Sequence, residues 1–153
     1  MNKNILFLII IALVAWSVNK SDETEALTAK NLTIITGADE HIFAVEHAQT
    51  YQQKQQGLMH REHLDEMAGM IFIYQQPRII SMWMKNTLIP LDMIFIDEQG
   101  IIRTIRKNTV PHSLESISSE VPVVAVLEIN GGMSEKLNIN KGDRVSYENT
   151  FTP

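Results

Sequence analysis

The chain has 153 residues, of which 44% are hydrophobic and 20% are charged, a composition typical of a single globular domain. Its formal net charge is -5 and no run of Lys or Arg forms a basic stripe, so nucleic acid is not an expected partner. The absence of cysteine excludes disulfides, thiolate metal sites and cysteine nucleophiles.

The first 17 residues have the pattern of a signal peptide. Lys3 supplies positive charge near the amino terminus, and residues 5–14 form an unbroken apolar run. Ala15 and Ser17 are small residues at the spacing of a signal-peptidase site. This pattern predicts export to the periplasm or to the outside of the cell.

An uncleaved membrane anchor is the alternative interpretation of the same segment. The apolar stretch, residues 5–18, is shorter than the roughly 20 residues that span a bilayer, which favours cleavage. Residues 18–30 are rich in Ser, Thr, Asp, Glu and Lys and predict a flexible linker. We expect one globular domain over residues 31–150.

The first part of this domain predicts a hairpin and a helix. Residues 32–35 and 42–46 are short β-prone runs around a Gly-containing turn. Thr50 and Gln53 have the spacing of a capping box, which places a helix directly after Thr50, and Gly57 is suited to end it. A second short turn or helix is expected over residues 61–66.

The rest of the chain consists mainly of apolar segments of strand length. Pro111 and four serines predict a long loop over residues 108–120, and a brief helix is expected over residues 133–137. Together with the first hairpin, about eight short strands and two minor helices predict a mainly β domain, either a sandwich or a distorted barrel. The remaining predicted strands are residues 69–74, 79–85, 91–97, 101–106, 121–129 and 144–147.

A polar elbow, residues 85–87, separates two of these strands. Asp92 lies inside the second strand, on the face that also carries Ile94 and Ile96. A carboxylate among apolar neighbours needs hydrogen-bond donors, because burying it unpaired costs several kcal/mol or more. The elbow residues Lys85, Asn86 and Thr87 are the nearest donors in the sequence.

Several short motifs occur in a fixed order along the chain. They are Gly57-Leu58-Met59-x-Arg61, Gly69-Met70-x-Phe72, Met84-Lys85-Asn86-Thr87-x-x-Pro90-Leu91-Asp92-x-x-Phe95-x-Asp97 and Val126-Leu127-Glu128. By these motifs the chain resembles the DUF192 family (domain of unknown function 192), small prokaryotic proteins that are often exported, over about residues 44–147. The resemblance implies a compact, mainly β fold and supplies no established activity.

The elbow has a structural and a functional interpretation. Asn86 and Thr87 are turn-forming residues, and Asp92 is able to accept backbone amides without doing any chemistry. Alternatively, Trp83 shares a strand face with Lys85, and an exposed indole beside an ammonium and an amide makes a platform for a sugar. Burial of Trp83 in the core is the structural alternative.

Arg61 and Glu128 are further polar residues within the motifs. Arg61 is able to clamp an anionic ligand or to pair with Glu128 or Asp92. If Asp92 and Glu128 faced each other across a cleft, the two carboxylates would suit acid/base hydrolysis with Arg61 in support.

We therefore expect an exported, non-catalytic binding module for a small polar ligand, with saccharides as one class, or for a partner protein. A hydrolase is the alternative. His60 and His63 share a spacing that suits a metal, but they lie in a polar, exposed turn, so no metal site and no cofactor is expected. The candidate ligand-binding residues are Arg61, Trp83, Lys85, Asn86, Thr87, Asp92 and Glu128.

Overall fold

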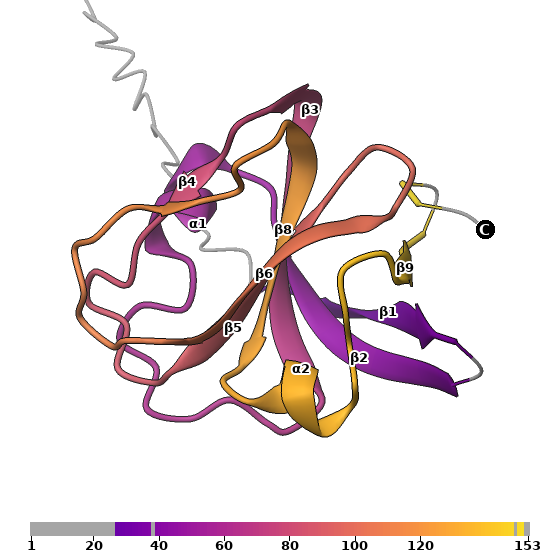
Figure 1. Ribbon diagram of the computed structural model, residues 1–153. Helices are drawn as coiled ribbons and strands as arrows, with labels where there is room; N and C mark the ends of the chain where they lie inside the picture. Colours follow the sequence, from indigo (N-terminus) through magenta and orange to yellow (C-terminus); the bar gives the residue numbers. More distant parts are fainter. Residues whose placement is uncertain (1–26, 38, 149, 152–153) are drawn as a thin grey trace, which may run out of the picture.

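A computed structural model describes residues 27–37, 39–148 and 150–151 (Figure 1). In these residues the chain forms nine strands and two short helices, which confirms the mainly β prediction. The elements are β1 (Ala29–Thr36), β2 (Asp39–Ala48), α1 (Tyr51–Gln56), β3 (Ala68–Arg78), β4 (Ser81–Met82), β5 (Leu91–Ile96), β6 (Ile102–Thr109), β7 (Ile117–Ser118), β8 (Val123–Asn130), α2 (Met133–Lys136) and β9 (Arg144–Ser146).

The predicted signal peptide and most of the predicted linker lie outside the described residues. The linker prediction extended to residue 30, but β1 already begins at Ala29, which is paired with Glu46 of β2. Among the described helices, none has the length and apolar character needed to cross a membrane.

Seven strands form one curled sheet in the order β6-β5-β8-β3-β2-β1-β9. All neighbours are antiparallel except β2 and β3, which are parallel. An isolated bridge joins Ile101, just before β6, to Arg144 of β9, and the Val145 N–H donates to the Gly100 carbonyl at 2.7 Å. The two edges of the sheet therefore meet at one end, which gives the sheet the shape of a half-barrel.

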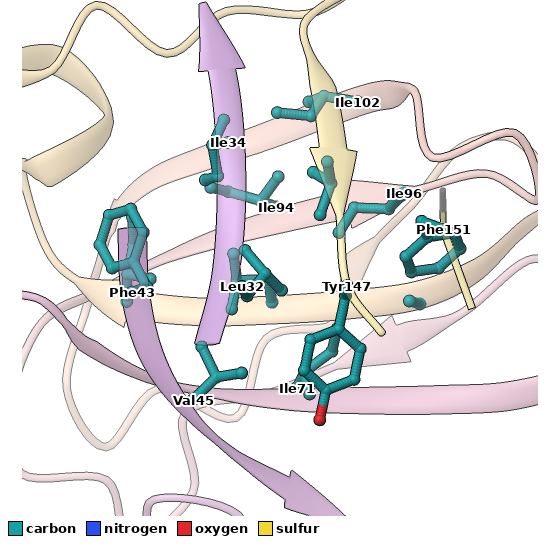
Figure 2. Close-up of a cluster of buried hydrophobic side chains, with 14 of the residues drawn as sticks. Leu32, Ile34, Phe43, Val45, Ile71, Ile94, Ile96, Ile102, Tyr147 and Phe151 are labelled. Atoms are coloured by element: carbon teal, nitrogen blue, oxygen red, sulfur yellow. The ribbon is translucent and has the colours of Figure 1, made fainter. Parts of the chain in front are cut away.

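Apolar side chains cover both faces of the central strands. One core cluster lies inside the curl and includes Ile71, Ile94 and Leu127, and Figure 2 shows it. A second cluster on the opposite face includes Phe72 and Phe95. All six residues of β5 are buried, which explains why this strand is apolar almost throughout rather than alternating.

The segment predicted as one strand over residues 79–85 is extended only in part. Ser81 and Met82 alone pair with the two-residue strand β7 and form a separate small sheet. Beyond them, the Met84 N–H donates to the Ser113 carbonyl, and the Thr87 N–H donates to the Met84 carbonyl. The strand ends here because only two residues of the neighbouring segment, β7, pair with it.

The parallel pairing of β2 and β3 has a consequence for the connection between them. Parallel neighbours need a crossover segment rather than a tight turn, and here residues 49–67 form it. This crossover contains α1, which lies beside β4 in Figure 1, while α2 lies at the other end of the molecule.

Candidate functional site

The carboxyl group of Glu128 forms the floor of the candidate site. Its cross-strand neighbours are Met70 of β3 and Met93 of β5, so Glu128 lies on the face of the second core cluster. Only 4% of the residue is exposed, and within the described part of the chain no group hydrogen-bonds to its side chain. Burial raises the pKa of Glu128 from 4.5 to about 8. The carboxyl group therefore holds its proton at neutral pH and can donate a hydrogen bond.

A pocket of about 460 Å³ opens at Glu128. Three segments wall it: residues 54–59, which are the end of α1 and the following turn, Phe72 and Tyr74 of β3, and residues 81–87 without Met84. The volume falls in the range of small-molecule sites. About half of the lining residues are polar or charged, a larger share than in most such sites, so the pocket suits a polar ligand.

Local sequence fixes α1 as a wall of this pocket. The Gln53 N–H donates to Thr50 Oγ1 at 3.1 Å, and the Thr50 N–H donates to Gln53 Oε1 at 2.9 Å, so the predicted capping box is present. The Gly57 N–H closes the helix by donating to the Gln53 carbonyl at 2.8 Å. None of the six helical residues is buried, but the Lys54 ammonium donates to the Ile73 carbonyl and attaches α1 to β3.

Gly57 brings the backbone close to Glu128. Its φ of +50° lies in the left-handed region that favours glycine. A Cβ atom at this position would lie 3.3 Å from Phe72 Cζ and 3.9 Å from Glu128 Oε2. The missing side chain therefore keeps the pocket open above the carboxyl group.

The elbow forms the facing wall of the pocket. One elbow residue and one residue of the turn after α1 have left-handed backbone conformations. Asn86 has a φ of +54° and His60 a φ of +63°, and the His60 N–H donates to the Asn86 carbonyl at 2.9 Å. Thr87 is buried, and its hydroxyl donates to the Lys85 carbonyl at 3.3 Å. These bonds tie the elbow to the turn that follows α1, so the two walls are linked.

Lysine and arginine side chains lie over two aromatic rings at the pocket. Trp83 is 49% exposed, and Lys85 Nζ lies 5.1 Å from its ring centroid, so the indole and the ammonium lie together at the rim. Lys54 Nζ and the Arg78 guanidinium lie 4.7 and 4.5 Å from the Tyr74 ring centroid. Partial burial, and then the charge of Arg78, lower the pKa of Lys54.

Asp92 is fully buried away from this pocket, and its donors differ from those we expected. The backbone N–H groups of Asn108 and Gly132 donate to Oδ1 at 2.8 and 3.0 Å, and that of Ser134 donates to Oδ2 at 2.8 Å. No side chain of the elbow contributes a bond. Asp92 thus joins β5 to the end of β6 and to the start of α2.

Asp92 and Glu128 lie on opposite faces of the sheet. Asp92 is paired with Ile129 and Glu128 with Met93, so the two carboxylates occupy adjacent register positions on neighbouring strands. Side chains at adjacent positions point to opposite faces. The structure therefore does not form the cleft with two facing carboxylates that acid/base hydrolysis would use.

Arg61 pairs with a residue that the sequence analysis did not consider. Its guanidinium donates to both carboxylate oxygens of Glu46, at 2.6 and 2.7 Å. Arg61 therefore contacts neither Glu128 nor Asp92. Of the candidate residues, Trp83, Lys85, Asn86, Thr87 and Glu128 come together at the pocket.

The histidine pair does not assemble a cluster of ligands. His63 Nε2 lies 3.0 Å from Asp65 Oδ1 on an exposed turn. Within residues 27–37, 39–148 and 150–151, no three or more His, Asp or Glu side chains are placed to hold a metal ion.

The sequence analysis predicted five of the fifteen residues that line the pocket, and three of the others matter for the site. Lys54 belongs to an exposed helix and Tyr74 ends an apolar run, so neither stands out in the sequence. Gly57 was singled out as a residue that ends a helix and as part of a family motif, but not as a pocket residue. Its position at the end of the helix was the available signal, because glycine there commonly adopts a positive φ.

Comparison with known proteins identifies the family. The sequence profile of DUF192, described as "Uncharacterized ACR, COG1430", matches residues 33–147. The chain belongs to this family, as its motifs indicate. No curated protein matches the chain.

Two solved structures are similar to it. One is a protein from Sinorhizobium meliloti 1021 provisionally assigned as a transcription regulator, with 42% identity and a TM-score of 0.76, covering 78% of this chain and 94% of that one. The other is a protein of unknown function from Novosphingobium aromaticivorans DSM 12444, with 36% identity and a TM-score of 0.78, covering 82% of this chain and 89% of that one.

Proposed function

We propose that the protein is a non-catalytic binding module for a small polar ligand that occupies the pocket at Glu128. The observation that carries this proposal is the Glu128 carboxyl group, which is almost fully buried, has no partner in the described residues and is accessible only from a pocket. Buried polar groups are nearly always hydrogen-bonded in folded proteins, because an unpaired one destabilises the fold. A ligand that bonds to Glu128 would supply the missing partner.

The rim of the pocket favours a ligand with a ring. Trp83 is exposed beside Lys85, and an indole next to hydrogen-bonding groups suits the stacking of a saccharide. Phe72 and Leu58 add apolar wall deeper in the pocket. Saccharides are therefore the first class of ligand to test.

Other functions have less support in the molecule. Hydrolysis with two facing carboxylates has no support in the placement of Asp92 and Glu128. The provisional assignment of the Sinorhizobium protein suggests DNA as a ligand, but a net charge of -5 without a basic stripe does not favour contact with phosphates. A partner protein would have to use the exposed rim rather than the floor.

A thermal-shift screen tests the proposal directly. The panel contains monosaccharides and disaccharides, nucleotides and divalent metals, applied to the wild type, to Lys85→Ala and to Lys141→Ala as a control at an exposed lysine outside the pocket. A ligand at ten times its Kd stabilises the fold by about 1.4 kcal/mol. We expect a shift that Lys85→Ala reduces and Lys141→Ala preserves. A panel without any shift would refute the proposal.

We also propose that the protein acts outside the cytoplasm, on the basis of the signal-peptide pattern in residues 1–17. Intact-mass analysis of the full chain expressed in a Gram-negative host tests this. A mass that corresponds to loss of about the first 17 residues supports export with cleavage. A full-length product in the cytoplasm contradicts it.

A further inference from the structure

The charged groups around Glu128 are mainly cationic. Lys54 of α1 and Lys85 of the elbow both line the pocket, and Arg78 lies behind Tyr74 of β3. Glu46 of β2 is in the same cross-strand row as Glu128, but Arg61 neutralises it. Burial keeps the Glu128 carboxyl group neutral at pH 7, so the lysines give the pocket a positive charge.

The pocket offers several hydrogen-bond donors beside the side chains of Gln55 and Gln56, which both donate and accept. In the described residues, the Lys85 ammonium and the Asn86 side-chain amide have no hydrogen bond or salt bridge. The Lys54 ammonium donates one hydrogen bond to the Ile73 carbonyl and has two N–H groups left. The protonated Glu128 carboxyl adds a further donor. A ligand that satisfies this set needs several acceptor oxygens.

We propose that the ligand is a small hydroxylated carboxylate, such as a uronic acid, whose carboxylate interacts with Lys85 and Lys54 and accepts the hydrogen bond of Glu128. This inference rests on the proposed binding function and names its ligand class. The ring of such a ligand would lie against Trp83, and its hydroxyl groups would reach Asn86.

Cationic and phosphorylated ligands fit these groups less well. The Trp83 and Tyr74 rings already carry the cations of Lys85, Lys54 and Arg78, so a second cation would be repelled. The pocket is bordered by the carboxyl end of α1, which carries a partial negative charge. That partial charge repels any anion, and it opposes a dianionic phosphate more strongly than a singly charged carboxylate.

Isothermal titration with four related sugars tests the charge of the ligand. At pH 7, glucuronate should bind at least tenfold tighter than glucose, glucosamine should bind more weakly than glucose, and glucose 6-phosphate more weakly than glucuronate. Lys85→Gln should reduce glucuronate affinity about tenfold and glucose affinity by a smaller factor, whereas Lys141→Gln should change neither.

The pH dependence tests the role of Glu128. Glucuronate affinity should fall about tenfold between pH 7 and pH 9, because ionised Glu128 repels the carboxylate. Glu128→Gln keeps a donor but does not titrate, so its affinity should be nearly constant over this range. Lys54→Gln removes a nearby group whose pKa is lowered by burial, and this variant should retain the wild-type decline. A decline that persists in Glu128→Gln but disappears in Lys54→Gln would contradict the assigned role of Glu128.

The outcomes separate this inference from the proposed function. Equal affinity for glucose and glucuronate, or tighter binding of glucosamine or glucose 6-phosphate, overturns the carboxylate assignment and leaves a binding module. If none of the four sugars binds while another member of the thermal-shift panel does, the ligand class is likewise wrong. If nothing binds in either experiment, both proposals fail.

Discussion

Asp92 and Glu128 are two buried acidic residues on neighbouring strands, one register position apart. They differ in the number of hydrogen bonds that their carboxyl groups accept. Three backbone N–H groups surround Asp92 on the inner face of the sheet. On the other face, Glu128 has no partner in the described residues and opens onto a pocket.

This difference shows that burial of an acid does not by itself distinguish structure from function. Asp92 connects β5, β6 and α2, so its bonds are used up within the fold. The hydrogen-bonding capacity of the Glu128 side chain is not used within the described residues. The informative quantity is the number of protein partners that each carboxyl group has, because a buried group without partners destabilises the folded state.

Replacing Asp92 should have the largest effect on stability. Asp92→Ala leaves three N–H groups without an acceptor and should lower the free energy of unfolding by about 3–5 kcal/mol. Asp92→Asn keeps one acceptor oxygen and should cost less, about 2–3 kcal/mol. Urea denaturation measures both, with Glu115→Ala at an exposed position as the control. An unchanged midpoint for Asp92→Ala would contradict the structural role.

Replacing Glu128 should act in the opposite direction and depend on pH. The folded-state pKa of about 8 exceeds the ordinary value of 4.5, so the stabilisation from the neutral form is complete below pH 4.5 and is lost as the pH rises to about 8. Glu128→Gln removes this loss. Relative to the wild type, its free energy of unfolding should increase by about 2–4 kcal/mol between pH 4.5 and 8.

Urea denaturation of the wild type and of Glu128→Gln at pH 4.5, 6.5 and 8.5 checks this prediction. The difference between the two proteins isolates Glu128 from the other titrating groups, such as His47, whose pKa burial lowers. A constant difference across the three pH values would show that Glu128 is ionised in the folded protein.

Narrowing the pocket at Gly57 should have an intermediate effect. Gly57→Ala places a Cβ atom 3.3 Å from Phe72 Cζ in a backbone with positive φ, which should cost about 1–2 kcal/mol and weaken ligand binding. Gly37 has nearly the same φ, +55°, but open space around it, so Gly37→Ala measures the backbone strain alone. Equal losses in the two variants would mean that the Phe72 wall does not restrict the pocket.

The smallest effect is expected for the third carboxylate of this face, Glu46. It is only partly buried and has a bidentate partner in Arg61. Arg61→Ala should lower the free energy of unfolding by about 1 kcal/mol, since a partly exposed ion pair is screened by solvent. A double-mutant cycle of Arg61→Ala and Glu46→Gln, in which thermal unfolding measures the stability of each variant, gives the coupling energy of the pair. A coupling energy near zero would mean that the Arg61–Glu46 ion pair does not stabilise the fold.

Local features of the fold were predictable from the sequence because neighbouring residues determine them. The Thr50 capping box and the first hairpin are set by residues a few positions apart, and both are confirmed. The β4 strand was predicted too long, because its length depends on a partner more than thirty positions away. The parallel pairing of β2 and β3 has no local signature.

The same distinction applies to the site. The contact between Trp83 and Lys85 follows from their spacing on one chain segment, and the structure confirms it. The donors of Asp92 lie 16, 40 and 42 positions away, so the sequence suggested the nearer elbow instead. That Asp92 and Glu128 face apart follows only from the register between β5 and β8, which the sequence does not reveal.

The shallow attachment of α1 has a consequence for exchange kinetics. None of its six residues is buried, and its capping box and the Gly57 hydrogen bond lie within the helix, whereas all residues of β8 except the last are buried. Lys54 attaches α1 to β3 through the Ile73 carbonyl. The amide hydrogens of α1 should therefore exchange with deuterium through local opening, while those of β8 should require global unfolding. Such opening would move one wall of the pocket while the strand that carries Glu128 stays in place.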